Sequence, residues 1–543
     1  VYNYVELRKE LEGDGYVFTT GTDTEVIMAA YDRWGHECLS RFNGMWAFAL
    51  YDRRTRRMLI ARDRFGVKPL YWVRTSRLFV FASEIKALLE HPEILRRPNV
   101  DRCRAYLAMG PREYLQETLF EGVHRLPNAS YVEATLDDLV GGRFTIRRFW
   151  NLVPNTSNEP FSPRACSEYA ARYLELLTSA VELRLRADVR IGSTLSGGID
   201  SSSVVWLANQ TLKKRGSVDL QETFSSIYLS RDTKHCDESG YVDTLASNLN
   251  VRSHRIEPDV ADVVSEHRKM IWHMDTPPES TLMSSWLTFK HIGHTRVKVV
   301  LEGQGADEQL AGYPRFLINV IAHSRQPWAD FRALRRMPTA SAFRALGLGA
   351  HMCERVGLGG LPVRALQILG KHVYLGGTLN EALVRDSLTG LQNLIHYADR
   401  TSMAFSVESR MPFLDYRVAE FLAALPAAYK VHDGWTKYLA RVAFDGKLPA
   451  RIAWRRDKMG WEIPEDVWFR GPLQGWAAEQ VSKSRFLREL GPRSGIAAVL
   501  SGPGRGLYGP IRLLNLATWY DVHIEREREP LQSPAMPASD CAA

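Results

Sequence analysis

The feature that most constrains the fold is an alternation of short apolar runs with stretches of helical period, which begins near residue 166. The apolar runs have the length of strands, and the stretches between them space their apolar residues as one face of a helix does. The predicted strands cover residues 187–195, 223–230, 252–257 and 296–303, and the predicted helices cover 168–186, a segment starting at Asp200, and 238–249. This alternation favours a parallel, doubly wound sheet. Ligands of such sheets bind at the carboxyl ends of the strands.

The first 150 residues follow a different pattern, in which short apolar runs are separated by turns. These runs predict strands over residues 45–52, 57–63, 70–73 and 78–83. A helix is expected before them, over residues 23–35, with Thr22 or Asp23 as its N-cap and Gly35 just past its end. This part is therefore predicted to be a strand-rich α+β domain.

Length and local composition predict how the chain is divided. A chain of 543 residues exceeds the roughly 250–300 residues at which a single core stops growing, so at least two domains are expected. The segment 151–165 is polar and Pro-containing, which is typical of a linker. Residues 320–390 are rich in Arg and Gly, and we expect a helical insertion there. The tail 525–543 is charged and then Pro- and Ala-rich, which favours disorder.

Composition and charge argue against several classes of protein. The net charge is +8, but Lys and Arg are interleaved with Asp and Glu, so we expect no nucleic-acid partner. No stretch approaches the roughly 18 apolar residues that span a membrane, and the first residues lack the features of a signal peptide, so we expect no membrane partner and a cytoplasmic location. The six cysteines are scattered without a CxxC pair, which argues against disulfides and structural zinc.

The turn TLSGGIDSSSV, residues 194–204, has the composition of an anion site. Ser196, Gly197 and Gly198 follow a predicted strand, and a predicted helix starts over 200–203, so unpaired backbone N–H groups converge beside a positive helix end. Glycines let a phosphate approach the main chain closely, and the serines add hydroxyl donors. The phosphate-loop motif GxxxxGK[ST] is absent from the chain. An ordinary strand-to-helix turn with a polar cap remains the alternative.

A second glycine-rich turn, within VVLEGQGADEQLAGY at 299–313, also follows a predicted strand. Its Asp307, together with Asp200 of the first turn, is predicted to bind Mg²⁺, because carboxylates beside a polyphosphate need a hard divalent cation between them. The alternative is that both carboxylates are surface caps. Lys437 and Lys458 are candidates for neutralising a leaving pyrophosphate, against the alternative of solvated lysines.

Longer motifs extend across almost the whole chain. SGGIDSSS resembles the pyrophosphate loop of the ATP pyrophosphatases. LEGQGADEQLAGY, the segment 396–421 and TKYLARVAF with LPARIAWRRDKMGWEIPE resemble the synthetase domain of glutamine-dependent asparagine synthetases. YNYVELR, DTEVI, RFNGMWAFALYD, ARDRFGVKPLYW and FASEIKALL resemble that family's glutaminase domain.

The resemblance implies a fold and a division into domains. The expected fold is an α+β N-terminal nucleophile-type glutaminase domain, an αββα sandwich, over residues 1–150. It is followed over 166–524 by an α/β synthetase domain with a doubly wound parallel sheet of the adenine nucleotide alpha hydrolase type. Residues 525–543 are the expected tail.

The resemblance also implies an activity with named site residues. Glutamine hydrolysis supplies ammonia through an internal channel, and ATP with Mg²⁺ activates the aspartate side chain as an acyl-adenylate, from which ammonia displaces AMP. The partners are thus small molecules, with a homodimer left open. The implied ATP and pyrophosphate residues are Thr194, Ser196, Gly197, Gly198, Asp200, Ser201, Ser226 and Gly303. The implied catalytic residues are Gln304, Arg400, Lys437 and Lys458, the substrate residues are Glu408, Arg410 and, for glutamine, Asp23, and the metal residues are Asp200 and Asp307.

Two positions depart from the resembled family. Many members have Glu where this sequence has Gln304, and a neutral amide can orient a substrate but cannot act as a base. Members open with Met-Cys-Gly, and the exposed Cys is their nucleophile. This sequence opens at Val1 within the family's NGEIYNY segment, and Cys38 and Cys103 lie outside the nucleophile motif. We therefore expect that initial residues are missing and that the chain as written does not hydrolyse glutamine.

Two alternatives to asparagine synthesis stay open at this point. Related lactam synthetases and peptide cyclases use the same activation but transfer the acyl group to an internal amine. The N-terminal half is alternatively a non-catalytic scaffold for the synthetase half.

Overall fold

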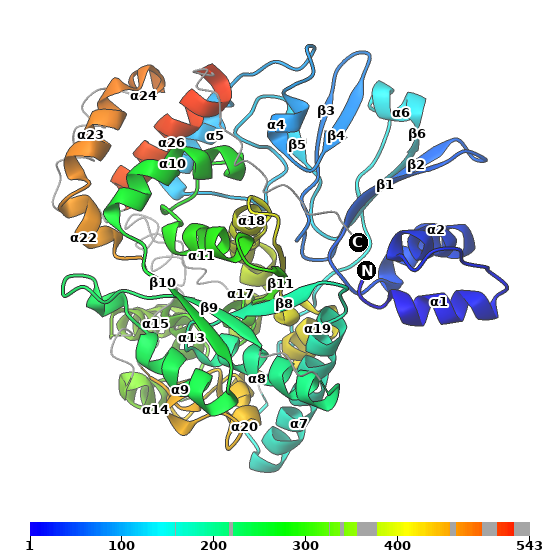
Figure 1. Ribbon diagram of the computed structural model, residues 1–543. Coiled ribbons are helices and arrows are strands. Elements are labelled where there is room, and N and C mark those ends of the chain that lie inside the picture. Colours follow the sequence, from blue (N-terminus) through cyan, green and yellow to red (C-terminus); the bar gives the residue numbers. More distant parts are fainter. Residues whose placement is uncertain are drawn as a thin grey trace.

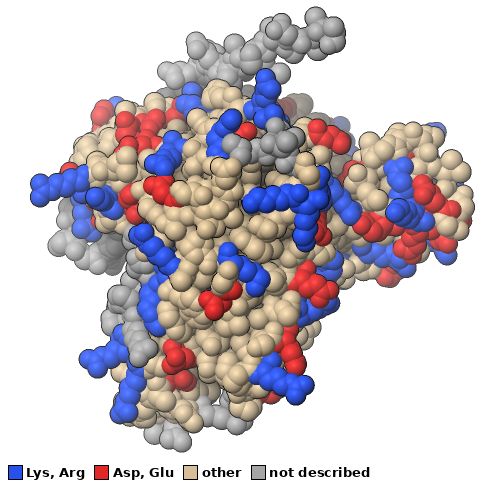
Figure 2. Space-filling model, turned by 60° about the horizontal axis from the view of Figure 1, so that its bottom comes forward, with Lys and Arg blue, Asp and Glu red and all other residues tan. Residues whose placement is uncertain are grey.

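The computed structural model describes residues 1–157, 159–216, 221–324, 326–336, 341–355, 377–456, 463–490 and 508–525. The expected tail beyond residue 525 lies outside the described residues. Among the described helices, none combines the length and apolar character needed to cross a membrane. The face drawn in Figure 2 carries Lys and Arg interspersed with Asp and Glu.

The N-terminal part contains two antiparallel sheets. One has the order β1-β2-β6-β7 and the other the order β4-β3-β5. The strands are β1 (Ala47–Asp52), β2 (Arg57–Arg62), β3 (Tyr71–Arg74), β4 (Phe79–Ala82), β5 (Val123–Arg125), β6 (Ser130–Thr135) and β7 (Arg147–Arg148). The first four match the predicted runs, and α2 (Asp23–Trp34), capped by Thr22 and ended by Gly35, matches the predicted helix.

The period-two pattern of β2 explains how these sheets are layered. Leu59 and Ala61 are buried against α1 (Tyr4–Gly13) and α2, whereas Ile60 between them is buried with Leu70, which directly precedes β3 of the second sheet. The second sheet packs in turn against α5 (Val100–Met109) and helices of the C-terminal part. The layers therefore run helix, sheet, sheet, helix, and α1 and α2 form the outer layer in Figure 1.

The C-terminal part contains the parallel sheet that the sequence predicts. Its five strands have the order β10-β9-β8-β11-β12, and every neighbouring pair is parallel. The strands are β8 (Arg190–Thr194), β9 (Glu222–Ser226), β10 (Arg252–Ile256), β11 (Val297–Leu301) and β12 (Glu408–Arg410). The chain moves outward from β8 in one direction and then crosses back to β11, so the switch point lies between β8 and β11.

Helices cover both faces of this sheet. In Figure 1, α11 (Met283–Gly293) lies above it, and α7 (Pro163–Arg184), α8 (Ile199–Lys214) and α9 (Ser239–Leu249) lie below. Adjacent residues of β11 divide between these layers: Val300 packs with Phe289 of α11, and Leu301 packs with the cluster that includes Val205 of α8. The sheet is therefore doubly wound.

Helices occupy the described parts of the predicted insertion at 320–390. They are the end of α13 (Leu317–Ala322), α14 (Pro327–Ala333), α15 (Ser341–Arg355) and α17 (Leu379–Leu388), and α18 (Gly390–Met403) begins at its end. The expectation of a helical insertion is confirmed there, while residues 356–376 lie outside the described residues.

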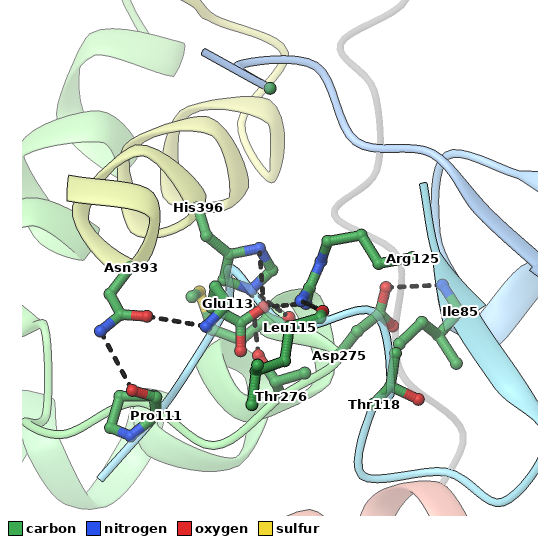
Figure 3. A network of polar contacts seen from close by, with 12 residues as sticks. Ile85, Pro111, Glu113, Leu115, Thr118, Arg125, Asp275, Thr276, Asn393 and His396 are labelled. Carbon is green, nitrogen blue, oxygen red and sulfur yellow. Dashed lines mark hydrogen bonds and ion pairs between the residues drawn. The ribbon is translucent and has the colours of Figure 1, made fainter. Parts of the chain in front are cut away.

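A network of polar contacts joins the two parts of the chain (Figure 3). Asn393 of α18 accepts a hydrogen bond from the backbone N–H of Glu113 at 2.9 Å and donates one to the carbonyl of Pro111 at 3.1 Å. The carboxylate of Glu113 pairs with Arg125 and faces His396 of α18, whose Nδ1 lies 3.9 Å away. Because these groups are buried, they fix how α18 sits against the N-terminal part.

Candidate active site

Two glycine-rich turns meet at the switch point of the parallel sheet. The first joins β8 to α8, and the second joins β11 to α12 (Ala306–Gln309). A Cβ atom added at Gly303 would lie 2.6 Å from the backbone nitrogen of Ser201. Only glycine therefore lets the two turns approach this closely, and their main chains form one surface.

The first turn directs the amino end of α8 toward this surface. Gly198 is the N-cap and brings no side chain to cap the first N–H groups, which leaves them to a ligand. Gly197 has a φ of +71°, and a Cβ atom there would lie 2.5 Å from the Cβ of Tyr241. The hydroxyls of Ser196 and Ser201 lie 3.1 Å apart beside the helix end. Amides, hydroxyls and the helix dipole together suit an anion.

A cavity of about 740 Å³ adjoins the two turns. The predicted site residues that line it are Thr194, Ser196, Asp200, Ser201, Gly303, Gln304 and Asp307. The rest of the lining includes Glu279, Ser280, Leu282, Ser284 and Ser285 near the start of α11, Leu394, Tyr397 and Ala398 of α18, and Ile463, Glu465 and Asp466 at the start of α22 (Glu465–Arg470). The structure thus brings together residues from distant parts of the chain.

Lys437 links the two carboxylates that the sequence predicts as metal ligands. Its Nζ lies 2.5 Å from Oδ2 of Asp200 and forms a second ion pair with Asp307. Lys437 is 2% exposed and has a φ of +53° immediately before α20 (Tyr438–Phe444). A non-glycine residue in this conformation is strained, and such strain is concentrated at functional sites. A Cβ atom at Gly312 would collide with both Asp307 and Lys437, so glycine leaves room for this pair.

The carboxylate oxygens of Asp200 and Asp307 suit a Mg²⁺ ion that is held jointly with a substrate phosphate. Mg²⁺ favours hard oxygen ligands and is usually held by one or two carboxylates together with substrate phosphates. The described residues contain no group of three or more His, Cys, Asp or Glu side chains that could hold a metal ion. The pair therefore suits a cation that arrives with a polyphosphate.

Three predicted residues of the parallel sheet have partners outside the cavity lining. The hydroxyl of Ser226 lies 2.9 Å from the hydroxyl of Thr288 on α11 and also donates at 3.1 Å to the carbonyl of Ser284, which does line the cavity. Arg410 of β12 contacts Glu408 at 2.6 Å and donates to the carbonyl of Arg184 at 2.7 Å. These residues support the sheet that carries the cavity, and they are not among its lining residues.

Three more predicted residues lie elsewhere. Arg400 of α18 donates to the carbonyl of Ser83 at 2.7 Å and pairs with Glu84 at 3.2 Å, so it ties the two parts of the chain together. Asp23, at the start of α2, lies in the N-terminal part and pairs with the α-amino group of Val1 at 2.6 Å. Lys458 lies outside the described residues.

The sequence analysis missed two buried carboxyls of the cavity wall. Glu302 is 5% exposed and Glu465 is 8% exposed, and burial raises the pKa of each to about 7. The hydroxyl of Ser409 donates to Glu302 at 2.7 Å, and the backbone N–H of Thr281 donates to Glu465 at 2.5 Å. Both stand in motifs quoted above, Glu302 beside Gly303 in LEGQGADEQLAGY and Glu465 at the end of LPARIAWRRDKMGWEIPE, but neither was singled out as a site residue.

The two cysteines that fall outside the nucleophile motif are buried. Burial raises the pKa of Cys38 and of Cys103 to about 12, so both thiols stay protonated at neutral pH. A thiol of this kind is a poor nucleophile.

The fold and the cavity define a doubly wound α/β protein with a site at the switch point of its sheet that suits an anion. Comparison with known families identifies it further. Residues 172–504 match the asparagine synthase family, and residues 1–150 match the glutamine amidotransferase domain family. The chain belongs to the asparagine synthase family.

Relatives resemble this chain over most of its length. Asparagine synthetase [glutamine-hydrolyzing] 3 of Bacillus subtilis is 27% identical, over 96% of this chain and 86% of that protein. Asparagine synthetase [glutamine-hydrolyzing] 1 of the same organism is 28% identical, over 89% of this chain and 78% of that protein. The similarity therefore spans both parts of the chain.

Proposed function

We propose that this protein is a glutamine-dependent asparagine synthetase, a ligase that amidates the side chain of aspartate at the expense of ATP. The observation that carries the proposal is the meeting of two glycine-rich turns around a cavity in which Asp200, Lys437 and Asp307 form one charged cluster. Such a cluster fits a reaction in which pyrophosphate leaves and negative charge must be neutralised.

The chain's own residues have distinct tasks in this reaction. The first N–H groups of α8 and the hydroxyls of Ser196 and Ser201 bind the two phosphates that leave as pyrophosphate. Asp200 and Asp307 hold Mg²⁺, which supplies charge neutralisation of the phosphates when bound. Lys437, fixed beside both carboxylates, adds a positive charge at the same place. Thr194 and Gly303 border the nucleotide.

An acidic part of the cavity wall suits the amino-acid substrate. Glu279, Glu465 and Asp466 line the cavity, and their carboxyl groups match the α-ammonium group of aspartate. Leu394 and Tyr397 of α18 also line the cavity, and we propose that such side chains limit the access of water that would otherwise compete with ammonia. Arg400 lies in α18, and Glu408 and Arg410 lie in β12. Because none of the three lines the cavity, we propose that they position the substrate indirectly, through these two elements.

The domain division belongs to the same proposal. Residues 1–150 form the glutaminase domain of the N-terminal nucleophile class, with Asp23 holding the amino group of glutamine, and residues 166–524 form the synthetase domain of the adenine nucleotide alpha hydrolase type. The layered sheets and the doubly wound sheet support these assignments. We place the enzyme in the cytoplasm, with ATP, aspartate and glutamine or ammonia as its small-molecule partners.

The test supplies the protein with ammonium, aspartate and Mg·ATP. We expect AMP, pyrophosphate and asparagine in equal amounts, and a K437M variant is expected to lose most pyrophosphate release because the charge at the cluster is gone. Release of ADP would contradict the adenylate route. A panel of other carboxylates, some with an internal amine, tests the lactam-forming alternative, and aspartate must dominate.

A further inference from the structure

The amide-forming step leaves a proton that the predicted catalytic residues do not accept. When ammonia attacks an acyl-adenylate, the new C–N bond carries an extra proton on nitrogen, and the amide forms only after that proton is lost. Gln304 lines the cavity, but its side chain is a neutral amide and cannot act as the base.

Most other carboxylates of the cavity wall already have strong partners. Asp200 and Asp307 share Lys437, Glu279 pairs with Arg512, and Asp466 faces His235 at 3.5 Å. Glu465 accepts the backbone N–H of Thr281. These partners hold the carboxylates in place, and Glu465, whose pKa burial also raises to about 7, lies at the start of α22 and not in either turn.

Glu302 is held differently. It follows β11 directly, and its backbone N–H donates to the carbonyl of Arg410 at 2.9 Å, so the sheet fixes its position. One carboxylate oxygen, Oε2, accepts the hydroxyl of Ser409 at 2.7 Å. Among the described residues, the Ser409 hydroxyl is the one hydrogen-bond donor recorded for this carboxylate, and Glu302 lines the cavity next to Gly303 and Gln304.

We propose that Glu302 is the proton acceptor of the ammonia-transfer step, an inference that rests on the proposed function. The nitrogen lone pair of ammonia forms the C–N bond, and the carbonyl π electrons move to oxygen. The proton on nitrogen then passes to the carboxylate of Glu302. The oxygen pair re-forms the carbonyl, the bond to the phosphate oxygen breaks, and AMP leaves with that electron pair. Glu302 afterwards returns the proton to solvent.

The environment of Glu302 supports this role. Burial raises its pKa to about 7, and the Ser409 hydroxyl moderates that rise, so near neutral pH the group can both accept and release a proton. The titratable side chains that share the cavity with it are Asp200, His235, Cys236, Glu279, Asp307, Tyr313, Tyr397, Glu465 and Asp466.

The experiment separates activation from transfer by using an E302Q variant. Aspartate-dependent exchange of pyrophosphate into ATP reports adenylation, and asparagine formation from ammonium reports the whole reaction. We expect E302Q to keep exchange within about threefold and to lose asparagine formation by about 10²–10⁴-fold, the usual contribution of a general base. At a fixed concentration of free ammonia, the rate of asparagine formation by the wild type should rise as the pH increases through about 7. The E302Q variant should lack this rise.

Two further variants make the test specific. S409A removes a donor that stabilises the carboxylate, so the rise should move to higher pH. E308Q changes another buried carboxyl whose pKa burial raises to about 7, but Glu308 bonds Tyr313 at 2.7 Å and does not line the cavity, so the rise should persist. Unchanged asparagine formation in E302Q, loss of exchange in folded E302Q, or a raised KM for aspartate alone would each overturn the proposal. No aspartate-dependent exchange in the wild type would instead refute the proposed function.

Discussion

Gly303 is the residue on which the contact between the two turns depends. Because a Cβ atom there would lie 2.6 Å from the nitrogen of Ser201, a G303A variant must push the turns apart. We expect it to lose about 1–3 kcal/mol in free energy of unfolding, as other overpacked sites do, and to bind ATP much more weakly. Urea unfolding and nucleotide titration by calorimetry measure the two effects.

The matched control for this substitution is G475A. Gly475 lies in α23 (Gln474–Lys483), and a Cβ atom added there meets nothing within 4 Å. Alanine favours a helix over glycine by about 1 kcal/mol, so this variant should be at least as stable as the wild type. If both variants behaved alike, steric exclusion at Gly303 would be wrong.

At the scale of residues, the sequence predicted those parts of the site that stand in contiguous motifs. Ser196, Asp200 and Ser201 belong to one turn and Asp307 belongs to another, so local chemistry was enough to select them, whereas Gly303 was selected through the family resemblance. The acidic wall at Glu279, Glu465 and Asp466 comes from segments whose proximity depends on tertiary packing. No local sequence pattern predicts such a wall. Local patterns also could not predict the ion pairs of Lys437 with Asp200 and Asp307.

At the scale of elements, Asp275 connects the end of one helix with the start of another. It follows α10 (Val260–Met274), and its carboxylate accepts the backbone N–H of Ile85 at 2.8 Å at the start of α4 (Ile85–Leu88). Burial alone would raise its pKa, but Lys86 and Arg400 outweigh that effect and lower the pKa to about 2.

This arrangement predicts how stability depends on pH. A carboxyl with a depressed pKa in the folded state stabilises the protein above its unfolded pKa of about 4, and this contribution is lost as pH falls toward about 2. The wild type should therefore lose about 2 kcal/mol more than D275N over this window, measured by urea unfolding. D101N, at an aspartate whose side chain is 92% exposed, is the control and should keep the wild-type slope. A wild-type slope in D275N would contradict the prediction.

The strands differ in how well the sequence could predict them. β8, β9, β10 and β11 are short segments that alternate with helices, and the structure confirms each of them, within a few residues of the predicted ends. β12 (Glu408–Arg410) has three residues, two of them charged, and pairs with β11 across a connection of more than 100 residues. Its place in the sheet depends on that distant partner, so no hydrophobic period in the local sequence predicts this strand.

At the scale of the whole molecule, one hydrophobic cluster contains residues of both parts. Tyr71 and Ile85 from the N-terminal sheet region are buried together with Met270, Trp286 and Trp519 from the C-terminal part. Separating the parts would expose these side chains to water at a cost of about 1.5–3 kcal/mol for each large apolar residue. We therefore expect a single calorimetric unfolding transition, and two resolved transitions would contradict the shared core.

The contact between Gly303 and Ser201 also bears on protein engineering. The segment 194–204 is contiguous in the sequence, yet the surface that it forms is completed by Gly303 in the turn after β11. A transplant of this segment into a different α/β scaffold would carry its amides and hydroxyls without that glycine. The surface formed by the two turns thus depends on the strand order, which places β11 beside β8, and it cannot be transferred with residues 194–204 alone.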